Sequence, residues 1–332
     1  MQKNYGVKFS GIGMGLPEKT VKNTDLEKLY DTSDEWIYSR TGIKERRVVS
    51  KNESGLSLCV KASREALLNS KTDPKDIDLI IVCTTTPDKL YPSMSCMLQG
   101  ELGALNAACF DLSAACSGFV YGIVTASQFI YTGECKNILL VGVDIHSRFL
   151  NWSERSVSIL FGDGAGAVLM TRCLAKEDEV LGYVIKSRSD VSLDLALDNQ
   201  NTAYAELQKT KEPNFVKMNG KAVYQFALEV VPDIVNQLLD NINLKNSDID
   251  YFVPHQANQR IIDSCAKKLG FKENQVISNI EKVGNTSSAS IPIAVYDGLL
   301  KGKIKAPSKV LMVGFGAGLT WGAVAINWKI KL

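Results

Sequence analysis

Cys116 is the residue of this 332-residue chain whose setting best suits nucleophilic chemistry. It stands in the segment Ser113–Val124, where we predict that a strand ends at Leu112 and an apolar helix begins. A thiol in the first turn of a helix faces unpaired N–H groups and the positive end of the helix dipole, which lower its pKa and favour the thiolate. A thiolate can attack an acyl thioester and become acylated. A small core cysteine would have the same local sequence, so that interpretation stays open.

His255 and Asn285 are the candidates for supporting groups. His255 directly follows a predicted strand, at the end of a strand where open α/β sheets gather their chemistry. Asn285 lies among small residues that lead into a helix, where its amide serves either as a turn and N-cap or as a donor to a developing oxyanion. The glycine-dense segment 314–322 likewise either permits a tight turn or directs N–H groups at an oxyanion. We expect His146 to be structural.

The elements that position these residues occur twice in the sequence. Segment 74–82 (PKDIDLIIV) matches 246–254 (NSDIDYFVP), and 139–142 (LLVG) matches 311–314 (LMVG), each at an offset of 172 residues. Cys116 pairs with Ser288 at the same offset, so we expect both at equivalent helix starts near a pseudo-twofold axis. In each half, helical periodicity alternates with short runs rich in Val, Ile and Leu, which predicts an α/β fold with helices covering a largely parallel sheet.

We therefore expect two similar halves, residues 1–172 with the nucleophile and residues 173–332 with His255 and Asn285. The polar run Asp198–Glu212 fits the repeat poorly and is predicted to be an insertion or a lid loop.

Composition narrows the classes of function. The formal net charge is +2, so no global charge favours nucleic acid as a partner. No apolar leader opens the chain, and glycines break its longest charge-free stretch, Val310–Trp328, so we expect a cytoplasmic protein without a membrane span. Eight cysteines without a C-x-x-C pair and only two histidines argue against disulfides and a metal site. The glycine-rich segments 11–15 and 161–166 lack complete nucleotide-binding patterns, so no nucleotide cofactor is expected.

Six motifs, in order along nearly the whole chain, resemble β-ketoacyl-acyl-carrier-protein synthase III, the initiating condensing enzyme of bacterial fatty-acid synthesis. They are Asp31–Ile37, Arg40–Ile43, Ala114–Gly118, Phe161–Gly166, Pro254–Asn258 and Gly284–Ser287. The resemblance implies the thiolase fold, a five-layered αβαβα arrangement of two similar halves about a pseudo-twofold axis. It also implies a decarboxylative condensation of an acyl-CoA primer with malonyl-acyl carrier protein, with coenzyme A thioester as substrate and no resident cofactor.

The same resemblance assigns roles to individual residues. Cys116 would be the acylated nucleophile, His255 and Asn285 the decarboxylation pair, and the N–H groups of Cys116 and Ala317 the oxyanion hole. Tyr91 occupies the position that shapes the primer pocket, and a homodimer is expected. The residues implied in coenzyme A binding, with Trp36 and Arg155 on either side of the adenine, are Thr32, Trp36, Arg40, Arg155, Tyr224 and Asn258.

The helix expected after His255 offers a face for a carrier protein. Its apolar residues are predicted to form a buried stripe of Ile261, Ile262, Cys265 and Leu269. Its basic residues Arg260, Lys267 and Lys268 project elsewhere and suit an acidic partner. A solvated basic helix that binds nothing would look the same in sequence.

Related chemistries compete with this interpretation. A degradative thiolase needs a second cysteine in the C-terminal glycine loop, but none follows Cys265. Elongating synthases need two catalytic histidines, and His146 is wrongly placed for one. A polyketide- or quinolone-type synthase with the same Cys-His-Asn set stays the main alternative. A catalytically silent partner subunit is disfavoured because that set is intact, and the sequence leaves the acyl length open.

Overall fold

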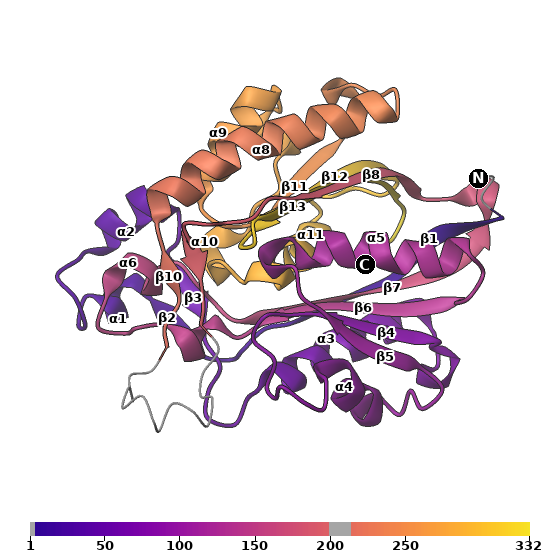
Figure 1. The fold of residues 1–332 in the computed structure, drawn as a ribbon, viewed down its shortest axis with the longest axis horizontal. Helices are drawn as coiled ribbons and strands as arrows, with labels where there is room; N and C mark the ends of the chain where they lie inside the picture. Colours follow the sequence, from indigo (N-terminus) through magenta and orange to yellow (C-terminus); the bar gives the residue numbers. More distant parts are fainter. Residues whose placement is uncertain (1–3, 199–213) are drawn as a thin grey trace.

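The computed structural model describes residues 4–198 and 214–332 and arranges them in five layers, αβαβα (Figure 1). The first sheet has the strand order β1-β7-β6-β4-β5, and the second has the order β11-β12-β13-β8. The strands of the first sheet are β1 (Tyr5–Gly15), β7 (Gly164–Leu174), β6 (Asn137–Asp144), β4 (Leu79–Cys83) and β5 (Ala108–Leu112). Those of the second sheet are β11 (Tyr251–Pro254), β12 (Ser308–Gly316), β13 (Thr320–Trp328) and β8 (Val180–Ser187).

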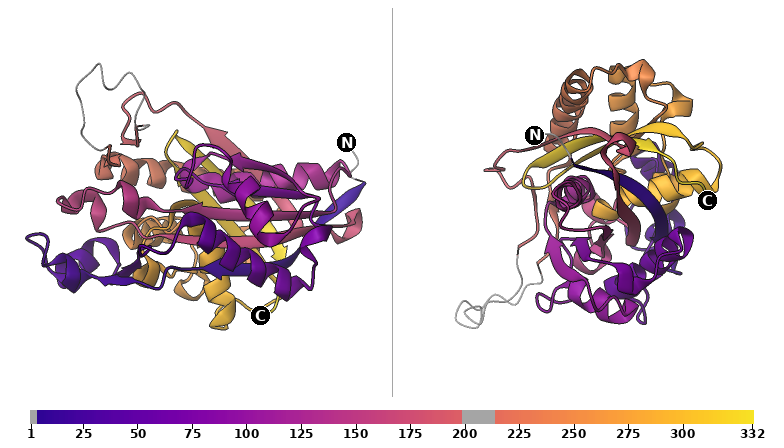
Figure 2. Two further views of the ribbon diagram at one scale, coloured as in Figure 1. Left: turned by 90° about the horizontal axis from the view of Figure 1, so that it is seen from below. Right: turned by 90° about the vertical axis from the view of Figure 1, so that its right-hand side faces the viewer.

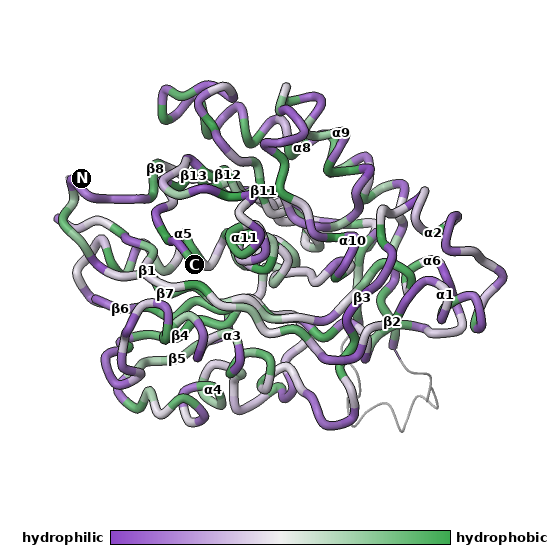
Figure 3. The backbone as a smooth tube through the Cα atoms, turned by 180° about the vertical axis from the view of Figure 1, so that it is seen from behind, coloured by the Kyte–Doolittle hydropathy of each residue, from purple (hydrophilic) through white to green (hydrophobic). Residues whose placement is uncertain are grey.

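Helices α5 (Gly118–Tyr131) and α11 (Ser290–Leu300) form the central layer, and the end-on view in Figure 2 shows α5 enclosed between the sheets. The outer layers are α3 (Gly55–Ser70) with α4 (Met94–Leu102), and α8 (Gly220–Asn241) with α9 (Gln259–Leu269). The central helices are buried on nearly all sides, as their continuous apolar sequences require. Hydrophobic segments accordingly run through the sheets and around α11 (Figure 3).

Both sheets are mixed, so the prediction of a largely parallel sheet is wrong. Parallel pairing is confined to β4 with β5, β4 with β6, and β11 with β12 among the described strands. The antiparallel neighbours of β12 and β6 are β13 and β7. Only three residues, 317–319, join β12 to β13, too few for the crossover that a parallel pair needs.

The predicted duplication is confirmed in the order and spacing of elements. The 3₁₀ turn η2 (Ala115–Ser117) directly precedes α5, and the equivalent turn η7 (Ser287–Ala289) directly precedes α11. The starts of β4 and β11, of η2 and η7, and of α5 and α11 each differ by 172 residues. The two halves share one apolar core, because α5 and α11 pack in the same cluster of buried side chains. The predicted boundary after residue 172 falls within β7.

Shorter elements gather at one end of the molecule, on the left in Figure 1. They are β2 (Thr20–Lys22), α1 (Asn23–Leu26), α2 (Asp34–Thr41), β3 (Glu45–Arg47), α6 (Arg155–Ser158) and β10 (Lys217–Met218). Apart from Asp198, the predicted insertion or lid loop, Asp198–Glu212, lies outside the described residues. No helix in the described part of the chain is long and apolar enough to cross a membrane.

Candidate active site

Cys116 lies in the turn η2, immediately before α5, and its side chain is 7% exposed. The glycine-dense loop after β12 packs directly on it. A Cβ atom on Gly316 would come within 2.9 Å of the backbone nitrogen and Cβ of Cys116, so only glycine fits there. The segment 314–322 therefore lies where its backbone can contribute to a site at the thiol, as one of its two predicted interpretations requires.

Burial raises the pKa of the Cys116 thiol to about 12, and Asp144 adds to the rise, while the hydroxyl of Ser287 opposes it. The prediction that a helix start lowers this pKa is therefore wrong. Cys116 precedes the α-helix rather than occupying its first turn, and removal of the thiol from water outweighs the local dipoles. The resting side chain is a thiol, and its proton must leave during any attack on an acyl group.

His255 directly follows β11, and its backbone N–H donates to the carbonyl of Val313 on β12 at 2.7 Å. Its ring Nδ1 lies 2.7 Å from Oγ of Ser290, the first residue of α11. That Oγ also accepts the N–H of Gln256 at 3.3 Å, which leaves the hydroxyl proton for Nδ1. The arrangement favours the tautomer with a proton on Nε2. Burial lowers the pKa of His255 to about 3, with His146 adding to the decrease, so the ring is a neutral donor at physiological pH.

Asn285 is fixed by both its backbone and its side chain. Its N–H donates to the carbonyl of Leu160 at 2.9 Å, and its carbonyl accepts from Gly162 at 3.0 Å. Its Oδ1 accepts the N–H of Ser287 at 2.8 Å, which orients the amide so that Nδ2 is left as a donor. The Ser287 hydroxyl in turn donates to the sulfur of Cys116 at 3.2 Å. The side-chain donor interpretation of Asn285 thus has the geometry that it needs.

Two cavities meet at Cys116, and each is lined by a different set of the predicted site residues. One, of about 220 Å³, is lined by Cys116, His255 and Asn285, so the structure brings the predicted set together. Arg40, Tyr224 and Asn258, three residues implied in coenzyme A binding, line the same cavity. The other, of about 490 Å³, is lined by Cys116 and Ala317, the residues of the predicted oxyanion hole.

The remaining residues implied in coenzyme A binding lie near that first cavity. The guanidinium of Arg155 stacks over the ring of Trp36 at 4.6 Å, and that of Arg40 lies 5.8 Å from the same ring. Arg155 also donates to the carbonyl of Asp31. Thr32 follows Asp31 and is half-buried. Asn258 caps α9 and donates from Nδ2 to the carbonyl of Arg40 at 3.1 Å, which joins the first-half segment to the second half.

Tyr91 does not reach either cavity in its own chain. It lies in the loop between β4 and α4, its side chain is 86% exposed, and the ring therefore projects into solvent rather than toward Cys116. The predicted apolar stripe on α9 is confirmed, because Ile261, Ile262, Cys265 and Leu269 are buried. Arg260, Lys267 and Lys268 are exposed, although Lys268 also donates to the carbonyl of Leu228 at 3.2 Å.

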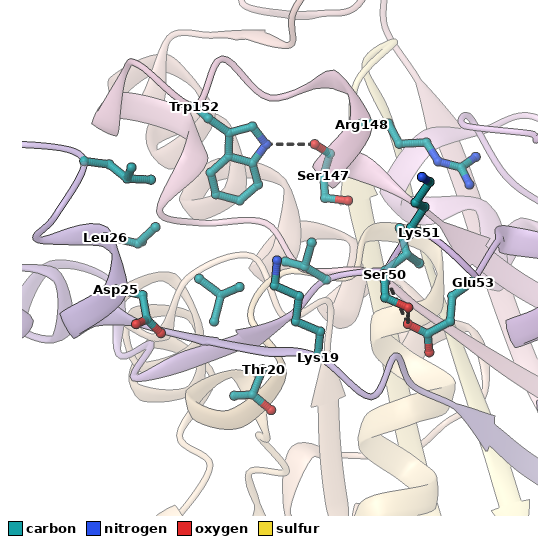
Figure 4. A pocket seen from close by; sticks show the side chains of 14 residues that line it. Lys19, Thr20, Asp25, Leu26, Ser50, Lys51, Glu53, Ser147, Arg148 and Trp152 are labelled. Carbon is teal, nitrogen blue, oxygen red and sulfur yellow. Dashed lines mark hydrogen bonds between the residues drawn. The ribbon is translucent and has the colours of Figure 1, made fainter.

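A separate cavity of about 790 Å³ holds none of the predicted site residues (Figure 4). Its labelled lining comes from β2 and the residue before it, from α1, from the segment before α3, and from the turn η3 (His146–Phe149) and the loop after it. Some of its polar groups already bond one another, such as Ser50 with Glu53. Among the described residues, no group of three or more side chains has the makeup of a metal site. The reactive groups lie in the two smaller cavities, so the chemistry belongs there.

Family comparisons agree with this geometry. Residues 110–189 match the family model "3-oxoacyl-(acyl-carrier-protein) synthase III", and residues 239–328 match its C-terminal counterpart. A β-ketoacyl-(acyl-carrier-protein) synthase III of Trichormus variabilis is 45% identical and aligns over 98% of this chain and 99% of its own length. This chain belongs to the synthase III family.

Structures of related proteins have the same fold. The synthase III of Aquifex aeolicus matches 97% of this chain and 100% of its own with a TM-score of 0.90 at 39% identity. A priming β-ketosynthase of a polyketide biosynthetic pathway matches 100% of this chain and 99% of its own with a TM-score of 0.92 at 33% identity. The fold is therefore shared between synthase III proteins and at least one polyketide-type relative.

Sequence reasoning missed three residues that surround the reactive groups of this synthase III family member. Ser287 bonds the nucleophile and fixes Asn285, and its place between Asn285 and Ser288 in one motif was a usable signal. Ser290 orients His255 from the start of α11, which only the packing of the two elements reveals. His146, expected to be structural, lines the cavity of about 490 Å³. Its sequence setting gives no sign of that position.

Proposed function

We propose that this chain condenses an acyl-CoA primer with malonyl-acyl carrier protein, with loss of carbon dioxide, to give a 3-oxoacyl-acyl carrier protein that begins fatty-acid synthesis. The observation that carries the proposal is the position of Cys116 where two cavities meet, with His255 and Asn285 in one of them. Membership of the synthase III family supports the same reaction.

In the first half-reaction, the sulfur of Cys116 attacks the carbonyl carbon of acyl-CoA. The bond to the coenzyme A sulfur breaks, and the thiol proton passes to that leaving sulfur, so the products are acyl-Cys116 and free coenzyme A. The raised pKa of the thiol means that the proton leaves as the new bond forms. The Ser287 hydroxyl, 3.2 Å from the sulfur, stabilises the charge that develops there.

In the second half-reaction, the malonyl group loses carbon dioxide and leaves an enolate. The Nε2–H of His255 and the Nδ2–H of Asn285 donate to its oxygen, and each such donor is typically worth about 3 kcal/mol. The enolate carbon attacks acyl-Cys116, and the N–H groups of Cys116 and Ala317 hold the oxyanion. Collapse of this intermediate releases the 3-oxoacyl product and returns the Cys116 thiol after protonation.

Coenzyme A is proposed to enter past Trp36, Arg40 and Arg155. The direct stacking of Arg155 on Trp36 at 4.6 Å leaves no room for an adenine between them. Binding of the nucleotide therefore requires Arg155 to swing aside and stack on the other face of the base. Tyr224 and Asn258 line the cavity that leads inward, where the pantetheine arm is proposed to lie.

The carrier protein is proposed to dock on α9 beside this entrance. Arg260, Lys267 and Lys268 are exposed there and offer positive charge to an acidic partner. Their contribution should weaken as ionic strength rises, because exposed charges are screened by salt.

A homodimer is the proposed assembly. Strand β5 lies at the edge of the first sheet, and the apolar side chains of Leu90, Tyr91 and Leu105 are exposed in neighbouring loops. Pairing of two such edges by a twofold axis would cover these groups. Tyr91 lies outside both cavities of its own chain. In such a dimer it would therefore shape the primer pocket of the partner subunit.

A polyketide-type priming reaction is the second candidate, favoured by the fold shared with the priming β-ketosynthase. The two functions differ in the carrier protein that receives the product rather than in the chemistry at Cys116. Rates with the fatty-acid carrier protein and with a polyketide carrier protein from the same organism distinguish them. Faster condensation on the polyketide carrier would favour the second candidate.

Intact-protein mass spectrometry tests the first half-reaction. Incubation with acyl-CoA should add one acyl mass, and peptide mapping should place it on Cys116. The primer panel has to include short, branched and long acyl groups, because the sequence leaves the acyl length open. A folded protein without an adduct across that panel would refute the proposed function.

A further inference from the structure

His146 is a buried polar group on the wall of the cavity of about 490 Å³. It opens the turn η3, directly after β6, and its side chain is 7% exposed. Its ring stacks on that of Phe161 with centroids 4.6 Å apart and an interplanar angle of 14°. Phe161 and Cys116 line the same cavity, so the imidazole faces the space beside the nucleophile.

The turn that carries His146 is held firmly by its neighbours. The N–H and Oγ of Ser147 donate to the carboxylate of Asp163 at 3.0 and 2.5 Å. The indole Nε1 of Trp152 donates to the carbonyl of Ser147 at 3.0 Å, on the side that faces the separate cavity of Figure 4. These bonds hold the backbone next to His146, and the stacking on Phe161 places its ring against that side chain.

No hydrogen-bond partner within residues 4–198 and 214–332 reaches either ring nitrogen of His146, and Nδ1 is fully buried. The other polar groups that line this cavity have partners or contact solvent. Thr85 bonds Asp144, Ser287 bonds Cys116, and Thr320 bonds the carbonyls of Ala114 and Ala317. Ser113 is exposed. His146 is thus the buried polar group of this wall whose hydrogen-bonding capacity is unused by the described residues.

Among the described residues, the rest of the wall is largely apolar and includes no lysine, arginine, aspartate or glutamate. Its apolar side chains are Phe161, Leu195, Leu197 and Val216, together with several alanines. A plain hydrocarbon chain in this space would shield the imidazole from water and leave it unpaired, which is costly for a buried polar group. A carboxylate would find no lysine or arginine among the described residues of this wall.

We infer that His146 selects the primer, and that the cavity favours an acyl chain bearing a hydroxyl group over the matching hydrocarbon chain. The inference rests on the proposed function, in which the acyl group on Cys116 occupies this cavity. Because Nδ1 is fully buried, the contact falls to Nε2, and a hydroxyl, which both donates and accepts, pairs with that nitrogen in either tautomer. A site that bonds a substrate hydroxyl discriminates against the analogue that lacks it more strongly than an apolar pocket does.

The test compares condensation of butyryl-CoA with that of 3-hydroxybutyryl-CoA and 4-hydroxybutyryl-CoA, with malonyl-acyl carrier protein as the second substrate. The wild-type chain should show a kcat/KM about tenfold higher for at least one hydroxylated primer than for butyryl-CoA. His146→Leu should abolish or reverse this preference, whereas His146→Gln, which keeps a hydrogen-bonding group, should retain part of it. The ratio between primers within one variant cancels a general loss of activity.

Leu197→Met serves as the matched control, because it changes the same wall without adding or removing a strong hydrogen-bonding group. It should change the kcat/KM of all three primers by a similar factor. Equal wild-type rates for the three primers would overturn the inference, as would a His146→Leu variant that keeps the wild-type ratio. If no primer is condensed at all while the protein is folded, the proposed function itself fails, and the inference fails with it.

Discussion

The two halves of the molecule place different residues at equivalent positions, and together these make one site. Cys116 in the first half corresponds to Ser288 in the second, and His255 in the second corresponds to Cys83 in the first. Cys116 and His255 line a common cavity, whereas Ser288 and Cys83 are buried against each other, with the Ser288 hydroxyl donating to the Cys83 carbonyl at 2.9 Å. The first half thus supplies the nucleophile and the second half supplies His255 and Asn285, while the equivalent positions Ser288 and Cys83 join the two halves.

The largest expected effect is the loss of the nucleophile. Cys116→Ala should give no acyl adduct and should reduce condensation by at least about a thousandfold, because the covalent intermediate cannot form. Adding Ser288→Cys to this variant should not restore the adduct. Position 288 faces the buried carboxylate of Asp144 and lies outside both cavities. Mass spectrometry checks both variants, and an acyl adduct in the double variant would contradict the division between the halves.

His255→Ala should leave the acylation of Cys116 intact but reduce decarboxylation of the malonyl thioester about 10²- to 10³-fold, because a donor to the enolate is removed. Release of labelled carbon dioxide measures the effect. The variant at the equivalent position, Cys83→Ala, should mainly lower the thermal stability, since Cys83 is buried in the core outside the cavities. Decarboxylation that falls equally in the two variants would show that position 255 acts through the fold alone.

The pH dependence of thiol alkylation distinguishes a buried Cys116 thiol with a raised pKa from a helix-start thiolate with a lowered pKa. Since burial raises the pKa of Cys116 to about 12, iodoacetamide should modify it about tenfold faster per pH unit from pH 7 to 10, without a plateau. The thiolate fraction grows over this whole interval because the pH stays below the pKa. Cys116→Ala supplies the background from other cysteines. A rate that levels off near neutral pH would restore the low pKa predicted from sequence.

The smallest of these effects is expected at Ser290, a positioning residue that acts through His255. Ser290→Ala removes the hydroxyl that holds Nδ1 at 2.7 Å, so decarboxylation should fall about tenfold in kcat with little change in KM. Ser290→Thr keeps the hydroxyl and should recover most of the rate. Equal losses in the two variants would point to packing at the start of α11 rather than to orientation of the imidazole.

The repeat made much of the fold predictable, because segments such as 74–82 and 246–254 retain the same residues at the same offset. The same repeat placed Cys116 at the start of a central helix. Strand direction was not predictable, because a fully buried strand such as β6 has the same continuous apolar sequence in a parallel sheet and in a mixed sheet. The thiol pKa, the lack of a partner for His146 among the described residues and the exposure of Tyr91 all depend on how distant segments pack, which the local pattern does not record.

A single-turnover chase of acylated protein tests most directly whether the two halves form one catalytic site. Protein acylated on Cys116 is freed of acyl-CoA, mixed with malonyl-acyl carrier protein and quenched at short times. The acyl mass should leave Cys116 and reappear in a 3-oxoacyl-carrier product with one equivalent of carbon dioxide, while His255→Ala should retain its acyl mass. Wild-type protein that keeps its acyl group, or a His255→Ala variant that transfers it at the wild-type rate, would contradict the account.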